Sequence, residues 1–116
     1  MSIHMRPSQA LRLWQQAALD EAAAGRPDLS FRQAAILLTI YLDPPPHTVR
    51  GLAARLNVTK PVVTRALDTM GALNLVSRHR DPADRRNVLI GRTVEGALYV
   101  ESFGDRIVAR AAELPL

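Results

Sequence analysis

The chain has 116 residues, of which 47% are hydrophobic and 22% are charged, and it contains no cysteine. This length and composition predict a single globular domain over residues 1–116, and the lack of cysteine excludes disulfides and thiolate metal sites. The first residues lack the apolar stretch of a signal peptide, and no run of about 18 apolar residues could span a membrane. We therefore expect a cytoplasmic protein with no membrane contact.

Positive charge is concentrated in one segment, within a net charge of +4. Between Thr48 and Arg92 the sequence has nine basic and three acidic residues, whereas the remainder has six basic and eight acidic residues. This asymmetry favours a surface that faces a polyanion, although a solvated arginine-rich face would give the same count.

Two amphipathic helices are expected before the basic segment. Ser8 is placed to cap the first, which spans about residues 8–24 and ends at Gly25. Ser30 is placed to cap the second, which ends at Pro44 because proline lacks the N–H that a helix interior needs. The apolar stripe of the second helix is expected to consist of Phe31, Ala34, Ala35, Leu38 and Leu42.

A helix-turn-helix motif is predicted over residues 48–73. Thr48 is placed to cap a short helix, and Asn57 can adopt the left-handed conformation that then turns the chain. Thr59 is placed to cap the next helix, with Pro61 in its first turn. The outer side of that helix is expected to carry Lys60, Pro61, Thr64, Arg65 and Asp68, and the buried side Val63, Ala66, Leu67, Met70 and Leu73.

A β-hairpin is predicted over residues 75–92, with a tip at Asp81 to Arg86 that carries two arginines. We expect Asp81 and Asp84 to hold the turn and the arginines to reach outward. Thr93 is placed to cap a last helix that ends near residue 113. The predicted fold is therefore mainly α with a small β-hairpin, in the order of a winged helix-turn-helix with flanking N- and C-terminal helices.

Four segments together resemble the winged helix-turn-helix of the multiple antibiotic resistance regulator (MarR) family. They are VTKPVVTRAL at 58–67, LVSR at 75–78, DPADRR at 81–86 and TVEG at 93–96. The resemblance covers roughly residues 29–100 and implies a dimeric regulator of transcription, often a repressor, that binds double-stranded DNA. It implies that the recognition helix enters the major groove and that a wing arginine reaches the minor groove. In many members a small, often phenolic ligand releases the DNA, so the resemblance leaves a small-molecule effector open.

The chain departs from the usual family pattern at three places. Asn74 stands where glycine is usual, which is tolerable because asparagine also visits the left-handed region. Arg92 stands where leucine is usual, and it either turns to solvent or adds a positive charge behind the wing. After Thr93 only 23 residues follow, whereas family members usually carry a further helix used in dimerisation.

The DNA contacts are expected to come from the helix-turn-helix and from the wing. Arg65 is the first choice for a base or phosphate contact, with a surface ion pair to Asp68 or another carboxylate as the alternative. At the wing, at least one arginine is expected to enter the minor groove, although Asp81 or Asp84 could pair with one. The full predicted set is Thr48, Thr59, Lys60, Thr64, Arg65, Arg78, Arg80, Arg85 and Arg86.

Other classes of site have weaker support in the sequence. No nucleophile has an evident histidine and carboxylate partnership, so we predict no enzyme and no cofactor. The three histidines, His4, His47 and His79, are expected at the surface without a metal. Trp14, Phe31 and Tyr41 are expected in core or dimer packing rather than in a ligand cage.

Apolar residues beyond the needs of one small domain predict a homodimer. They are Leu11, Trp14, Phe103, Ile107 and Val108. Two rival functions stay open: a winged-helix module for protein interaction, and a sequence-tolerant DNA-architecture protein.

Overall fold

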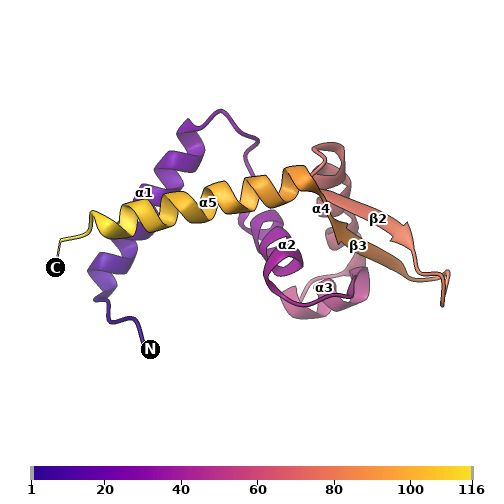
Figure 1. Ribbon diagram of the computed structural model, residues 1–116. Coiled ribbons are helices and arrows are strands. Elements are labelled where there is room, and N and C mark those ends of the chain that lie inside the picture. The colour runs from indigo at the N-terminus through magenta and orange to yellow at the C-terminus, as the bar shows by residue number, and fades with distance from the viewer. Residues whose placement is uncertain (1, 116) are drawn as a thin grey trace. The chain divides into compact units, whose positions relative to one another are not determined.

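A computed structural model describes residues 2–115 (Figure 1). The chain divides into two compact units, one that runs up to Asp28 and resumes at Glu101, and one that spans Leu29–Val100. Within the described residues there are five helices and a three-stranded antiparallel sheet, so the predicted mainly α fold class is confirmed. No helix in this part of the chain is both long and apolar enough to cross a membrane.

The Leu29–Val100 unit holds the buried core. Its elements are α2 (Phe31–Leu42), β1 (His47–Thr48), α3 (Val49–Leu56), α4 (Lys60–Ala72), β2 (Val76–Arg80), β3 (Val88–Arg92) and the first part of α5 (Val94–Ala112). The most fully buried side chains come from α2, α3 and α4, namely Ile36, Leu37, Ile40, Leu52, Val63, Leu67 and Met70. The helix-turn-helix is thus packed against α2 by apolar residues of all three helices.

The buried side of α2 differs from the predicted one. Ile36, Leu37 and Ile40 are buried, whereas Phe31 and Leu42 are 78% and 71% exposed. The helix is apolar around most of its circumference, so the 3.6-residue spacing fits two stripes and cannot select between them. The Ser30 cap is confirmed, since its hydroxyl accepts a 3.1 Å hydrogen bond from the Gln33 N–H.

Two asparagines in the left-handed region set the turns that frame α4. Asn57 has φ 55° and ends α3, and Asn74 has φ 58° and follows α4, as predicted from their tolerance of this conformation. The buried side of α4 is also as predicted, except that Leu73 is 37% exposed because it lies at the C-cap.

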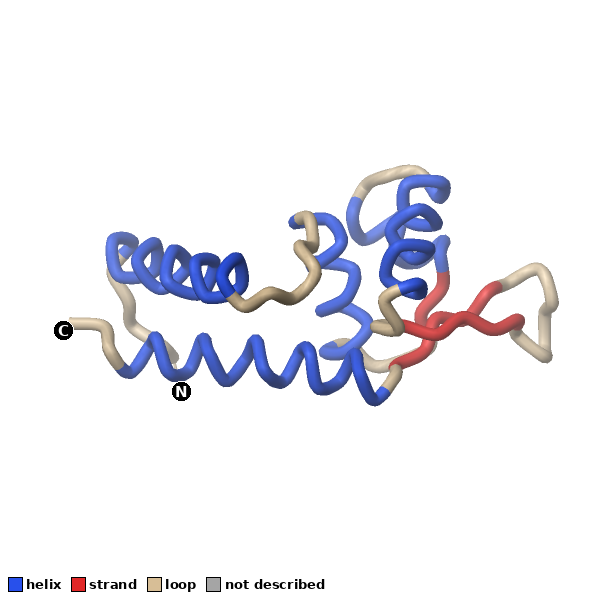
Figure 2. Tube along the Cα trace, turned by 90° about the horizontal axis from the view of Figure 1, so that it is seen from above, coloured by secondary structure: helices blue, strands red, loops and turns tan. Residues whose placement is uncertain are grey.

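The wing belongs to a sheet with one more strand than the predicted hairpin. The strand order is β1-β3-β2, with His47 opposite Ile90 and Thr48 opposite Leu89. The strands are the red segments of Figure 2. Strand β2 pairs along its whole length with β3, from Val76 opposite Arg92 to Arg80 opposite Val88. Through β1 the sheet is joined directly to the start of α3.

The Tyr41 hydroxyl joins α2 to the base of the wing and to α5. It donates to the Leu75 carbonyl at 2.7 Å and accepts from the Thr93 N–H at 2.9 Å. Thr93 caps α5 as predicted, since its hydroxyl accepts from the Gly96 N–H at 2.9 Å and donates to the Asn74 carbonyl at 2.7 Å. Three elements therefore meet at one tyrosine.

The other unit pairs α1 (Pro7–Ala23) with the second part of α5 by ion pairs. Arg110 bonds the Asp20 carboxylate at 2.7 Å, and Arg106 reaches Glu21 at 2.8 Å. The predicted cap at Ser8 is wrong: the N-cap is Arg6, whose N–H donates to Gln9 at 2.9 Å. The helix starts at Pro7, two residues before the first helical position that a Ser8 cap would give, because the first turn does not need the N–H that proline lacks.

Gly96 is required where α5 crosses Tyr41. A Cβ at this position would clash with the Tyr41 hydroxyl oxygen and with the Leu75 carbonyl oxygen, whereas a Cβ at Gly104 would meet no atom within 4 Å. We predict that Gly96→Ala lowers the free energy of unfolding by about 3 kcal/mol, the upper range for overpacking a buried site. Urea denaturation measures this loss.

Gly104→Ala is the matched control in the same helix. It should raise the free energy of unfolding by about 0.5 to 1 kcal/mol, because alanine is the better helix former. Equal effects of the two substitutions would contradict the close approach at Tyr41.

Candidate nucleic-acid interface

The outer face of α4 is exposed and basic at its N-terminal end. Lys60, Thr64 and Arg65 are exposed, and their side chains make no hydrogen bond or ion pair with another residue of the described chain. The predicted alternative of an ion pair between Arg65 and Asp68 is not formed, because Asp68 pairs instead with Arg78 at 2.6 Å. The Arg65 guanidinium therefore remains available to a ligand.

Thr48 and Thr59 both occupy N-cap positions, as predicted, but only one caps through its side chain. The Thr48 hydroxyl accepts from the Gly51 N–H at 3.0 Å, whereas the Thr59 hydroxyl makes no capping bond. The Thr48 oxygen is thereby used by the helix, while its hydroxyl proton is still free to be donated. The Thr59 side chain is exposed, and its hydroxyl neither caps α4 nor bonds another group of the described chain.

The two arginines at the wing tip differ in their contacts. Asp84 accepts from the Arg86 N–H and from its guanidinium, both at 3.1 Å, and Asp81 accepts from the Ala83 N–H at 2.9 Å. The predicted role of both aspartates in holding the turn is confirmed. The Arg85 side chain is exposed and makes no hydrogen bond or ion pair within residues 2–115.

The two arginines of β2 are engaged within the unit. Arg78 bonds Asp68 of α4, and the Arg80 guanidinium donates to the Arg85 carbonyl at 2.8 Å. The first contact joins β2 to α4. The second stabilises the backbone of Arg85, whose side chain is free. Both side chains are placed to stabilise the wing, so their availability to a phosphate is smaller than that of Arg65 or Arg85.

Arg50, in the first turn of α3, is a basic residue that the predicted set omitted. It is exposed, and its charge acts on the Asp84 carboxyl in the wing. The pairing of β1 with β3 explains this proximity, since Thr48 lies opposite Leu89 and Arg50 follows two residues later. A two-residue strand has no periodicity to detect, so the position of Arg50 near the tip could not be predicted from the sequence.

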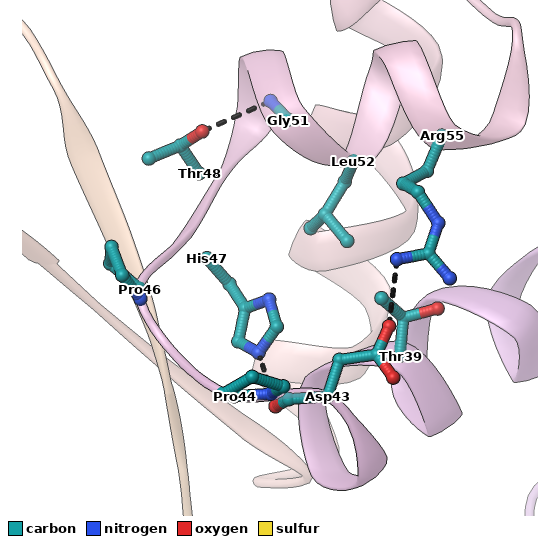
Figure 3. A pocket seen from close by; sticks show the side chains of 9 residues that line it. All are labelled: Thr39, Asp43, Pro44, Pro46, His47, Thr48, Gly51, Leu52 and Arg55. Atoms are coloured by element: carbon teal, nitrogen blue, oxygen red, sulfur yellow. Dashed lines mark hydrogen bonds and ion pairs between the residues drawn. The ribbon is translucent and has the colours of Figure 1, made fainter.

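A pocket of about 550 Å³ lies between the end of α2, β1 and α3 (Figure 3). Arg55 bonds the Asp43 carboxylate at 2.7 Å across it, and the His47 ring lies 3.1 Å from the Asp43 carbonyl. The predicted surface position of His47 is wrong, because β1 carries this residue into the sheet and leaves it 9% exposed. None of the three aromatic residues considered for a ligand cage lines this pocket.

No group of three or more histidine, cysteine or acidic side chains in the described chain is arranged to hold a metal ion. His4 and His79 are exposed, as predicted.

A wing beside a helix-turn-helix with an exposed basic second helix defines a class of DNA-binding proteins. The sequence matches the MarR family model over residues 28–87. The chain belongs to the MarR family, whose members are DNA-binding regulators of transcription. No curated protein matches the chain as a sequence relative.

Solved structures of transcriptional regulators share the fold. A MepR variant from S. aureus bound to an oligodeoxyribonucleotide has a TM-score of 0.71 and 25% identity, covering 88% of this chain and 76% of that one. The repressor CouR bound to a 23-mer DNA duplex has a TM-score of 0.71 and 22% identity, covering 91% and 72%. The regulator Tm0710 from Thermotoga maritima has a TM-score of 0.68 and 24% identity, covering 90% and 68%.

The contacts at the wing tip predict how Asp84 titrates. The Arg86 guanidinium bond, followed by the Arg86 N–H bond, holds the pKa of the Asp84 carboxyl below its usual value of 3.8, and the charge of Arg50 adds a smaller contribution. Since the folded pKa is depressed, this contact stabilises the wing above the ordinary aspartate range and is lost as the pH falls through the folded pKa. Arg86→Ala should therefore raise the pKa of Asp84, as measured by ¹³C NMR of the carboxyl carbon.

Arg50→Ala serves as the comparison and should raise the same pKa by less. An Asp84 titration that is unchanged in Arg86→Ala would contradict the described wing tip.

Proposed function

We propose that the chain binds double-stranded DNA as a homodimer and represses transcription by occupying its operator. The observation that carries the proposal is the division of the basic residues into engaged and free ones. Lys60 and Arg65 on α4, and Arg85 at the wing tip, are exposed cations whose side chains no carboxylate or carbonyl of the described chain engages. Free cations on an exposed face are suited to phosphates and base edges.

The recognition helix is proposed to be α4. Its N-terminal residues Thr59, Lys60, Thr64 and Arg65 would face the major groove, where an arginine can bond the two acceptors of a guanine edge. The N–H groups at the start of α3 and the hydroxyl of Thr48 would face a phosphate, since a helix N-terminus favours negative charge.

The wing is proposed to enter the adjacent minor groove through Arg85. Arg86 is held by Asp84, so its role would be to keep the tip in shape. A narrow minor groove has an enhanced negative potential that attracts a guanidinium group. Arg78 and Arg80 would contribute mainly to the long-range attraction of DNA. The proposed role consists of binding without a catalytic step, and we propose that the protein carries it out in the cytoplasm.

The DNA-bound structural neighbours add support. They share the fold across most of this chain; one is a MepR variant bound to an oligodeoxyribonucleotide, and the other is the repressor CouR bound to a DNA duplex. A small-molecule effector stays a prediction.

Substitutions on α4 and at the wing test the residue assignments. Arg65→Ala should weaken operator binding by about 1 to 3 kcal/mol, the range for a good base contact. Arg85→Ala should weaken it more than Arg86→Ala, because only the Arg85 side chain is free. Fluorescence anisotropy with a labelled duplex measures all three affinities, and each lost phosphate contact should also flatten the log–log salt slope by about 0.9.

Arg12→Ala is the charge-matched control, since Arg12 lies on α1 and bonds Gln15 at 2.7 Å. Unchanged affinity in both Arg65→Ala and Arg85→Ala would refute the assignment of these residues. Failure of the wild-type chain to bind any DNA at about 50 mM salt, where non-specific binding is strong, would favour the rival protein-interaction module.

The dimer is proposed to form through exposed apolar residues of α1 and α5. Leu11 and Val108 are 70% and 71% exposed, which is an unfavourable state for large aliphatic side chains gathered on one small unit. We predict a dimer at micromolar concentration by sedimentation velocity, and dissociation to a monomer in Leu11→Glu and Val108→Glu. Ala109→Glu adds the same charge to an exposed neighbouring position of α5 and should stay dimeric. A monomeric wild-type chain would exclude this arrangement.

A further inference from the structure

We propose that Arg92 is a positioning residue that fixes the base of the wing to the end of α2 and thereby sets the affinity of the wing for DNA. The proposal rests on the DNA-binding function above. Arg92 donates to the Ile40 and Asp43 carbonyls, whereas its two predicted alternatives were to turn to solvent or to add a positive charge behind the wing.

The need for Arg92 starts at the end of α2. In a helix, a carbonyl accepts from the N–H four residues later. The Ile40 carbonyl would require the N–H of residue 44, and Pro44 has none. The Arg92 Nε supplies the missing donor at 2.8 Å, in a partly buried position.

The same guanidinium group makes two further contacts with this helix end. One Nη donates to the Asp43 carbonyl at 3.1 Å, and the guanidinium carbon lies 5.8 Å from the centre of the Tyr41 ring. Bonds from a charged donor are stronger than neutral ones, and a cation is favoured at a helix C-terminus. Arg92 therefore replaces the capping contacts that the proline run removes.

Arg92 is well placed to control the wing because it is the last residue of β3. It lies opposite Val76, the first residue of β2, so it sits at the base of the hairpin whose far end carries Arg85. Asp43 extends the link, since its carbonyl also meets the His47 ring of β1 and its carboxylate binds Arg55 of α3. The wing base, β1 and the helix-turn-helix thus share one anchor.

Loss of the Arg92 contacts should weaken DNA binding by changing the position of Arg85. We predict that Arg92→Met weakens operator binding by about tenfold, equivalent to about 1.4 kcal/mol of coupling. In an Arg85→Ala background the same substitution should cost less than threefold, because the wing then has no groove contact to position. Arg92→Lys keeps the charge but not the fork of two donors, and its affinity should lie closer to that of Arg92→Met than to wild type.

The salt dependence separates positioning from direct contact. In the Arg85→Ala background, Arg92→Met should leave the log–log salt slope unchanged, whereas a direct phosphate contact by Arg92 would flatten it by about 0.9. A flatter slope in that background, full affinity of Arg92→Lys, or equal losses in the two backgrounds would each overturn the proposal. Arg12→Met is the control for a lost positive charge elsewhere.

A measurement without DNA keeps this test independent of the proposed function. Hydrogen exchange of the free protein should show faster exchange of β2 and β3 amides in Arg92→Met, with α4 amides unchanged. Unchanged wing amides would overturn the positioning role even if DNA binding is confirmed. Faster wing exchange in a chain that binds no DNA would instead refute the proposed function and leave the anchor in place.

Discussion

The end of α2 is the constraint on which the functional unit depends. Three successive prolines after Asp43 remove the N–H groups that the last carbonyls of the helix would use, and they do so beside the core. Arg92 replaces one of those donors at the Ile40 carbonyl, and the same guanidinium group also donates to the Asp43 carbonyl. A helix terminus that needs outside donors therefore brings the wing and α2 into a fixed arrangement.

The structure gives the basic residues of this unit two different kinds of work. One set bonds carbonyls and carboxylates within the fold. A second set, Lys60 and Arg65 on α4 and Arg85 at the wing tip, makes no such bond within the described residues, and neither do Arg32 and Arg50. The first set consists of Arg55, Arg78, Arg80, Arg86 and Arg92. Charge counting along the sequence cannot separate the sets, because both contribute equally to the excess of positive charge. The proposed DNA contacts come from the second set, and the geometry that presents them comes from the first.

Apart from the cap at Ser8, the sequence predicted the features that depend on local chemistry. Helix caps at Ser30 and Thr48, left-handed turns at Asn57 and Asn74, and the aspartates of the wing tip follow from what each side chain does to its own backbone. Features set by tertiary pairing were missed: the apolar surface of α2 fits two stripes, and strand β1 is too short to show alternation. The buried position of His47 and the proximity of Arg50 to the wing both follow from that missed strand. Those predicted DNA-contact residues whose side chains bond no other residue are exposed. The sequence alone does not distinguish Arg85 from Arg86, because they differ in a contact of the folded chain, the bond from Arg86 to Asp84.

The most direct measurement of the central claim is selection of bound DNA from random sequence, followed by footprinting on the selected site. A homodimer that reads DNA through α4 and Arg85 should select a palindrome whose half-sites are centred about one helical turn apart, with protection in the major grooves and in the flanking minor grooves. Diffuse protection without a consensus would indicate a sequence-tolerant DNA-architecture protein. That result, or the absence of any selected sequence, would contradict the account of a sequence-specific regulator.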